Sequence, residues 1–156
     1  MHAITFPVGP VHVTSGNPER PDGKAGAVPH RADHEQLQPR RILVVEDEVF
    51  VRLDIEQELE RAGYEIVGSA DTANEAILLA ERERPDLVLM DVRLVGQRDG
   101  IDAALELWRR FQIRCLFVSA NLDPASRTRA APAEPWGFLA KPFSPAELLS
   151  AIQRRH

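Results

Sequence analysis

The chain has 156 residues, of which 44% are hydrophobic and 28% charged, as is usual for a globular protein with a single core. Its formal net charge of -5 argues against general nucleic-acid binding, which needs a basic surface. Cys115 is the only cysteine, so an internal disulfide is excluded. The N-terminal stretch lacks the pattern of a signal peptide, and no apolar run reaches membrane-spanning length, so we expect a cytoplasmic protein.

Residues 1–39 differ in composition from the rest of the chain. They contain six of the twelve prolines and four of the nine glycines, with no sustained apolar period, which predicts a disordered N-terminal extension. Four histidines are scattered through it without the spacing of a metal site, at His2, His12, His30 and His34. A flexible extension, or a start assigned upstream of the real one, explains this composition better. We expect residues 40–156 to form the folded domain.

From residue 41 onward, short apolar runs alternate with segments of helical periodicity. Runs rich in aliphatic residues predict buried strands at 42–45, 64–70, 86–91, 115–120 and 136–140. Between them, apolar side chains recur at helical spacing, as at Val51, Ile55, Leu59 and Ala62. Ser144, Pro145 and Glu147 have the pattern of a helix start for the last segment. This alternation predicts an α/β fold, a doubly wound five-stranded parallel sheet with helices on both faces.

Polar side chains gather where these predicted strands end. In an open parallel sheet, sites form outside the carboxyl ends of the strands. The residues at those ends are Glu46 and Asp47, Asp91, Ser119 and Lys141. Any one of them could be polar only because the chain reaches the surface there. Three carboxylates, a hydroxyl and an ammonium together are harder to explain in that way.

This set of groups suits phosphoryl transfer to a carboxylate. Packed carboxylates repel one another unless a cation is present, and Mg²⁺ is a hard cation that prefers oxygen ligands. Asp91 could attack phosphorus to form an aspartyl phosphate, while Mg²⁺ and Lys141 neutralise the phosphoryl oxygens. Lys141 is one of only two lysines in a chain with seventeen arginines, and its compact ammonium fits this role.

With these residues in view, the segment 41–155 resembles the receiver domain of two-component response regulators. The motifs that carry the resemblance occur in the family's order, as VVEDE, LVLMDVRL, LFVSA and LAKPF. Together they imply a flavodoxin-like (βα)5 fold. The resemblance also implies a phosphoacceptor with no substrate turnover, phosphorylated by a sensor histidine kinase or a histidine phosphotransfer protein.

The resemblance assigns roles to individual residues. Asp91 would be the phosphoacceptor, and Asp47 and Asp91 would bind Mg²⁺ directly, with Glu46 holding it through water. The backbone carbonyl of Arg93 would complete the protein ligands. Ser119 and Lys141 would each bind a phosphoryl oxygen, and the bond before Pro142 is expected to be cis.

The output side departs from the family pattern. Phe138 occupies the position of the family's switch aromatic, which turns when Ser119 is drawn inward, and it lacks a tyrosine hydroxyl. Between the fourth and fifth predicted strands, residues 122–135 have no apolar stripe and contain three prolines. We therefore expect the fourth helix to be short or unstable, and the segment to be mobile.

The chain ends directly after its last predicted helix, so we expect a stand-alone receiver that signals through protein contacts, with an unknown target and a possible homodimer. A phosphorelay intermediate and a phosphate sink remain alternatives. Arg93 and Asn121 flank the route of attacking water and are expected to tune the lifetime of the phosphate. A metal-dependent phosphohydrolase would need a second acid or base and a cap, which are not evident. A scaffold that acts without phosphorylation would not need the full set of site residues.

Overall fold

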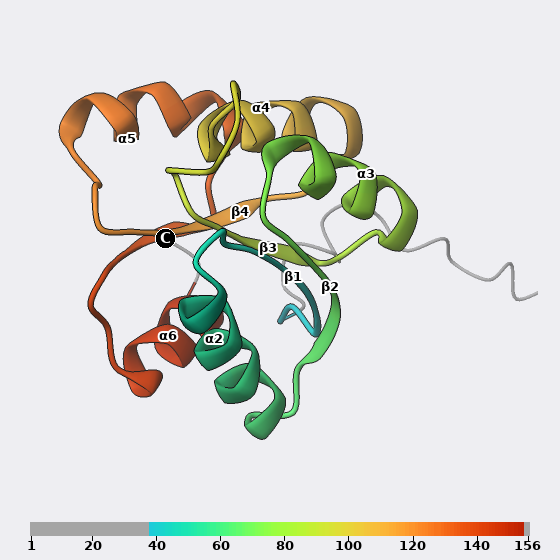
Figure 1. Ribbon diagram of the computed structural model, residues 1–156, viewed down its shortest axis with the longest axis vertical. Helices are drawn as coiled ribbons and strands as arrows, with labels where there is room; N and C mark the ends of the chain where they lie inside the picture. Colours follow the sequence, from blue (N-terminus) through green and yellow to red (C-terminus); the bar gives the residue numbers. More distant parts are fainter. Residues whose placement is uncertain (1–37, 155–156) are drawn as a thin grey trace, which may run out of the picture. The chain divides into compact units, whose positions relative to one another are not determined.

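The computed structural model describes residues 38–154. The expected disordered segment at 1–39, with its histidines, therefore lies outside the described residues except for positions 38 and 39. Within the described range, five strands form one parallel sheet in the order β2-β1-β3-β4-β5 (Figure 1). The strands are β1 (Arg41–Val45), β2 (Glu65–Ala70), β3 (Leu87–Met90), β4 (Cys115–Ser119) and β5 (Gly137–Ala140).

Helices cover both faces of this sheet, as the alternating pattern predicts. Figure 1 shows α3, α4 and α5 on one face and α2 and α6 on the other. Their bounds are α2 (Val49–Arg61), α3 (Ala73–Glu83), α4 (Gly100–Phe111), α5 (Pro124–Ala130) and α6 (Pro145–Gln153), with a 3-10 turn at Ala131–Ala133 after α5. The doubly wound α/β prediction is confirmed. No helix in residues 38–154 is long and apolar enough to cross a membrane.

The central strands alternate their side chains between two cores. Leu43 and Met90 pack under α3 and α4, whereas Ile42 and Leu89 pack against α2 and α6. Because both faces are covered, all four residues of β3 are buried, and the aliphatic run of β1 is buried as well. Each such side chain contributes about 1.5–3 kcal/mol by leaving water. This burial fixes where β1 and β3 end, and hence where the polar residues that follow them lie.

Local capping signals define several helix starts. Ser144 and Glu147 form a capping box at the start of α6, with Pro145 at the first helical position, as the sequence predicts. Asp99 caps α4 in the same way together with Asp102. One expectation in α2 is wrong. The sequence pattern predicts Ala62 within the apolar face of this helix, but Ala62 is exposed and lies just beyond the last turn, because the helix ends at Arg61.

The segment between β4 and β5 contains a short helix. Helix α5 has seven residues, begins with Pro124 and is capped by Asp123, whose side chain accepts a hydrogen bond from the backbone N–H of Ser126. The expectation of a short helix is confirmed, while the mobility of the segment stays a prediction. Ala130 is the only buried residue of α5.

Helix α5 lacks a broad apolar face, and ionic contacts hold it against the domain instead. One guanidinium nitrogen of Arg129 lies 2.6 Å from each carboxylate oxygen of Asp99 and 3.2 Å from Asp102 Oδ1. Burial alone would raise the pKa of Asp99, but its hydrogen bonds with Arg129 and Asp102 and the charge of Arg129 lower it below its ordinary value. These contacts tie α5 to the start of α4.

Candidate functional site

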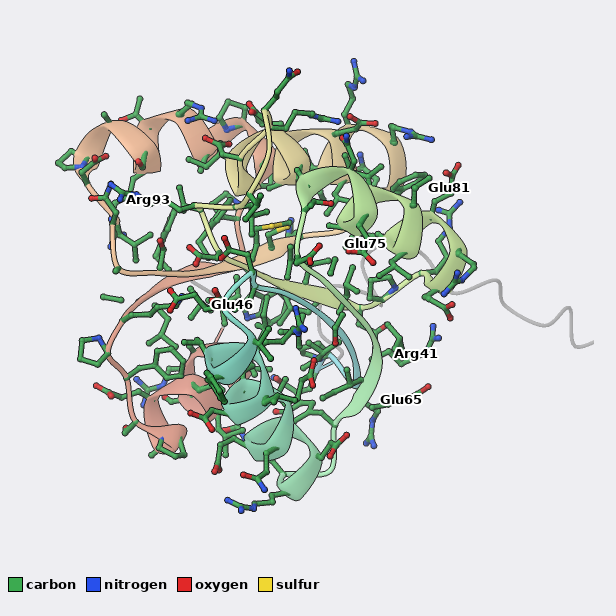
Figure 2. All side chains as sticks on the ribbon, in the orientation of Figure 1. Arg41, Glu46, Glu65, Glu75, Glu81 and Arg93 are labelled. Atoms are coloured by element: carbon green, nitrogen blue, oxygen red, sulfur yellow. The ribbon has the colours of Figure 1, made fainter. Side chains whose placement is uncertain are left out.

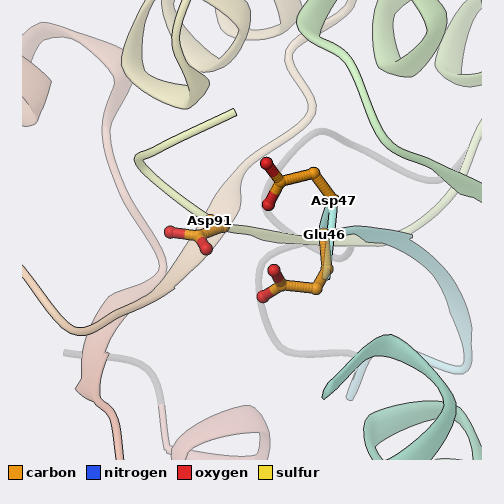
Figure 3. Close-up of side chains that lie close together, drawn as sticks. All are labelled: Glu46, Asp47 and Asp91. Carbon is orange, nitrogen blue, oxygen red and sulfur yellow. The ribbon is translucent and has the colours of Figure 1, made fainter. Parts of the chain in front are cut away.

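Three carboxylates meet at the carboxyl edge of the sheet. Glu46 and Asp47 follow β1, and Asp91 follows β3. Since β1 and β3 are neighbours, with Val45 paired to Met90, the residues after them emerge side by side. Figure 3 shows the three carboxylates gathered at this point. One oxygen from each lies within 4.8 Å of the others.

The cluster is largely shielded from water. Glu46 is 1% exposed and Asp91 6% exposed, although charged side chains are rarely buried without a partner. Glu46 and Asp91 directly follow the buried residues of β1 and β3, which keeps their side chains next to the core. Three negative carboxylates that are buried or half-buried repel one another, so they need positive charge nearby.

Lys141 supplies part of that charge. It follows β5, and its Nζ donates hydrogen bonds to Asp91 Oδ2 at 2.9 Å and to Glu46 Oε2. Partial burial alone would lower the pKa of Lys141, but the hydrogen bonds and charges of the two carboxylates raise it above its ordinary value. Burial raises the pKa of Glu46, and the hydrogen bond from Lys141 only partly opposes this. Lys141 therefore stays a cation among the carboxylates.

Backbone groups orient the two buried carboxylates. The N–H of Glu48 donates to Glu46 Oε1 at 3.1 Å, and the N–H of Arg93 donates to Asp91 Oδ1 at 3.1 Å. Each carboxylate thus has one oxygen bound by its own loop and one bound by Lys141. The side chain of Arg93 lies on the α5 side of the sheet, while Glu46 lies on the α2 side (Figure 2).

The remaining predicted site residues lie on the neighbouring strands. Ser119 is the last residue of β4 and is 2% exposed, and its Oγ accepts a hydrogen bond from the backbone N–H of Asn121 at 3.4 Å. Phe138 lies on β5 beside Phe117, with the ring centroids 5.5 Å apart. The peptide bond between Lys141 and Pro142 is cis. All the residues expected at the site thus lie at or just beyond the ends of β1, β3, β4 and β5, apart from Phe138, which lies within β5.

The donor set fits a magnesium ion. The carboxylates of Glu46, Asp47 and Asp91 offer only oxygen atoms as ligands, which suit a hard cation such as Mg²⁺. In the described part of the chain, Lys141 is the one cation that forms ion pairs with the carboxylates of Glu46 and Asp91, which leaves the cluster with an excess of negative charge. A divalent ion would balance that excess.

Two features of the site were not foreseen from the sequence. The first is the direct contact between Lys141 and Glu46, since the resemblance implied only a phosphoryl oxygen as the partner of the lysine. The second is Gly100, the first residue of α4. A Cβ placed on Gly100 would lie 1.8 Å from the backbone oxygen of Asp91, so only glycine fits there. The signal for this close approach was the glycine directly after the capping residue Asp99.

Comparisons with known proteins agree with this geometry. Residues 42–153 match the family model described as the response regulator receiver domain. The chain is 44% identical over 123 residues to the transcriptional regulatory protein PdtaR of Mycobacterium tuberculosis, covering 78% of this chain and 58% of that protein. It is 30% identical over 116 residues to the chemotaxis protein CheY of Thermotoga maritima, covering 74% of this chain and 96% of that protein.

Solved structures show the same architecture. The receiver domain of a modulated diguanylate cyclase from Desulfovibrio desulfuricans superposes with a TM-score of 0.69 at 31% identity, covering 76% of this chain and 94% of that chain. A CheY-like receiver from Methanospirillum hungatei gives a TM-score of 0.67 at 27% identity, covering 73% and 90%. The chain spans little more than half the length of PdtaR. By its sequence, its fold and its acidic site, the chain belongs to the response regulator receiver family of two-component systems.

Proposed function

We propose that this receiver accepts a phosphoryl group on Asp91 from a histidine kinase or a histidine phosphotransfer protein and signals through protein contacts. Receiver domains are in general phosphoacceptors in signalling rather than catalysts. One observation carries the proposal for this chain. The buried carboxylate of Asp91 lies within ligand distance of two further carboxylates and within hydrogen-bond distance of a lysine ammonium.

The transfer itself requires one bond to form and one to break. An oxygen of the Asp91 carboxylate attacks phosphorus, the bond between phosphorus and the donor's histidine nitrogen breaks, and its electron pair leaves with the imidazole. Asp91 is positioned for this by the N–H of Arg93 and by Lys141, each of which binds one of its oxygens. These contacts orient the carboxylate before the donor arrives, which lowers the entropic cost of the reaction.

Magnesium would be held by the carboxylates of Asp47 and Asp91 and the backbone carbonyl of Arg93, with Glu46 acting through water. When bound, it would supply the positive charge that neutralises the phosphoryl oxygens during transfer. Lys141 would pair with one phosphoryl oxygen and the hydroxyl of Ser119 would donate to another. Ser119 is buried at the end of the strand between β3 and β5, which suits this role.

We propose that Phe138, whose ring lies next to that of Phe117, takes part in the output step. As Ser119 moves toward the phosphoryl group, the ring of Phe138 would turn to fill the space that is vacated. Because Phe138 has no hydroxyl, the change would depend on packing. The phosphate on Asp91 would thereby alter the surface formed by α5, β5 and α6, where a protein partner would bind. A phosphorelay intermediate would use the same chemistry and pass the phosphoryl group on.

The test is labelling with a radioactive small-molecule phosphoryl donor or a cognate kinase in the presence of Mg²⁺. Wild type should be labelled and Asp91→Asn should not. Asp71→Asn is the matched control, because Asp71 follows β2 at the same edge of the sheet but is exposed. Equal labelling of wild type and Asp91→Asn would disprove the assignment of the acceptor.

A further inference from the structure

An arginine of α5 lies over the ring of Phe138. The central carbon of the Arg127 guanidinium is 4.5 Å from the ring centroid, a distance at which a cation is attracted to an aromatic face. A guanidinium is planar and weakly hydrated, so it stacks on aromatic rings better than a lysine ammonium does. Arg127 itself is exposed to solvent. The contact therefore covers the ring with a side chain that can move.

Phe138 packs against the core, where one of its contacts is with a fixed neighbour. Phe117 is fully buried on β4, and its ring stacks on that of Phe138 with an angle of 15° between the planes. The two residues are paired in the register of β4 and β5. Since Phe117 is part of the core, Phe138 cannot displace it. Because Arg127 lies over the face of the ring, we expect a reorientation of Phe138 to change its contact with Arg127.

Arg127 also reaches the loop that follows Ser119. Its Nε donates a hydrogen bond to the backbone oxygen of Leu122 at 3.3 Å. Within the same loop, the N–H of Asn121 donates to Ser119 Oγ. One arginine thus connects the loop of the buried hydroxyl with the aromatic residue on the next strand.

We propose that Arg127 is a positioning residue that holds Phe138 in the conformation of the unphosphorylated receiver and so opposes the phosphorylated state. The inference rests on the proposed function, because it concerns how the chain responds to a phosphoryl group on Asp91. When Ser119 moves toward that group, its loop carries Leu122 with it, and the hydrogen bond that orients Arg127 is lost. The guanidinium then leaves the ring, and Phe138 can turn.

Removal of the contact should make the phosphorylated conformation easier to reach. An exposed cation–π contact changes an equilibrium constant by about two- to fivefold. We therefore expect Arg127→Met to bind beryllofluoride, a phosphoryl mimic, with Mg²⁺ about two- to fivefold more tightly than wild type does. Methionine keeps much of the length of the side chain and removes both the charge and the Nε donor. Arg127→Lys keeps the charge, so its affinity for beryllofluoride should lie between those of wild type and Arg127→Met.

Fluorine NMR of the full chain with para-fluorinated phenylalanines provides a direct readout, with the Phe138 signal assigned by Phe138→Leu. In wild type, this signal should shift only when beryllofluoride and Mg²⁺ are added. In Arg127→Met, it should already be shifted part of the way in the free protein. Arg109→Met removes an exposed arginine of α4 and should behave as wild type. Thermal unfolding of each variant checks that it is folded.

A double-mutant cycle separates this role from a general structural one. If Arg127 acts through the ring, Arg127→Met should change beryllofluoride affinity little in a Phe138→Leu background. Unchanged or weakened affinity in Arg127→Met, with the wild-type Phe138 signal, would overturn the inference. If wild type itself shows no response to beryllofluoride and Mg²⁺, the proposed function fails instead.

Discussion

The ammonium of Lys141 lies 2.9 Å from Asp91 Oδ2, although 50 positions separate the two residues in the chain. The same ammonium contacts Glu46, so Lys141 joins the ends of β1, β3 and β5. A phosphoryl group on Asp91 would have to take this ammonium away from at least one carboxylate. We therefore expect Lys141 to respond when Asp91 is modified.

Substitution of Lys141 by alanine should impair the conformational response more than phosphate uptake. In the proposed mechanism, uptake depends chiefly on Asp91 and the metal ligands, whereas the response needs the lysine to move. A hydrogen bond to a charged group is worth about 1.5–3 kcal/mol, enough to weaken a two-state response strongly. The measurement is phosphate incorporation together with amide exchange over residues 119–145 in the phosphorylated sample. Poor uptake with a normal response after phosphorylation would contradict this role.

Substitution of Gly100 by alanine should damage both stability and phosphate uptake. The added methyl group would overlap the backbone oxygen of Asp91, so the acceptor or the start of α4 must move. Overpacking of this kind costs about 1–3 kcal/mol or more, seen as a lower urea midpoint.

The matched control for Gly100 is Gly96→Ala, in the loop that precedes α4. Gly96 has a φ of +114°, but a Cβ there would meet nothing within 4 Å. It should lose about 1–2 kcal/mol through backbone strain and still take up phosphate normally once folded. If folded Gly100→Ala took up phosphate as fast as folded Gly96→Ala, the close approach to Asp91 would not matter for the site.

The ion pair between Arg129 and Asp99 should contribute stability that depends on pH. The folded-state pKa of Asp99 is lowered, so its contribution is fully present above its unfolded value, near pH 4, and is lost as the pH falls through the folded value. Arg129→Gln should therefore have a lower urea midpoint than wild type at pH 6. The difference should shrink in acid. Arg109→Gln removes an equal charge from α4, and an identical pH profile for both variants would contradict the assignment.

Amide exchange should be faster in residues 122–135 than in the central strands. Helix α5 has seven residues and buries only Ala130, so few apolar contacts oppose its local opening. By contrast, β3 is buried along its whole length. Hydrogen exchange with mass spectrometry on the full chain resolves the two segments. Uniformly strong protection across 122–135 would show that the ionic contacts alone hold the segment firmly.

Much of the fold could be predicted from local patterns because those patterns are themselves the cause of the structure. The aliphatic run at 42–45 leaves water completely only in a strand that is covered on both faces. The capping box from Ser144 to Glu147 defines a helix start by itself. The edge of the sheet at which Asp91 and Lys141 lie follows from the order of strands and helices. The contacts that Asp91 and Lys141 make do not follow from this order, because the reach of a side chain depends on the twist and loops of the folded sheet.

The segment around α5 shows where local patterns fail. Its three prolines and missing apolar stripe predicted weak helix formation, and the helix is indeed short. What holds it in place comes from elsewhere in the chain: Arg129 pairs with Asp99, thirty positions away, and Arg127 lies over Phe138. Contacts between residues that lie so far apart in the chain leave no periodic signal in the sequence.

The ionic attachment of α5 also has a thermodynamic consequence. Detaching a segment that buries so little apolar surface changes the heat capacity very little, because that quantity follows the apolar area exposed to water. The opening of α5 would then add little to the heat-capacity change of unfolding and be only weakly sensitive to urea, yet it should respond to added salt, which screens exposed ion pairs. We therefore expect the ionic strength of the surroundings to change the surface at α5, where a partner of this receiver would bind.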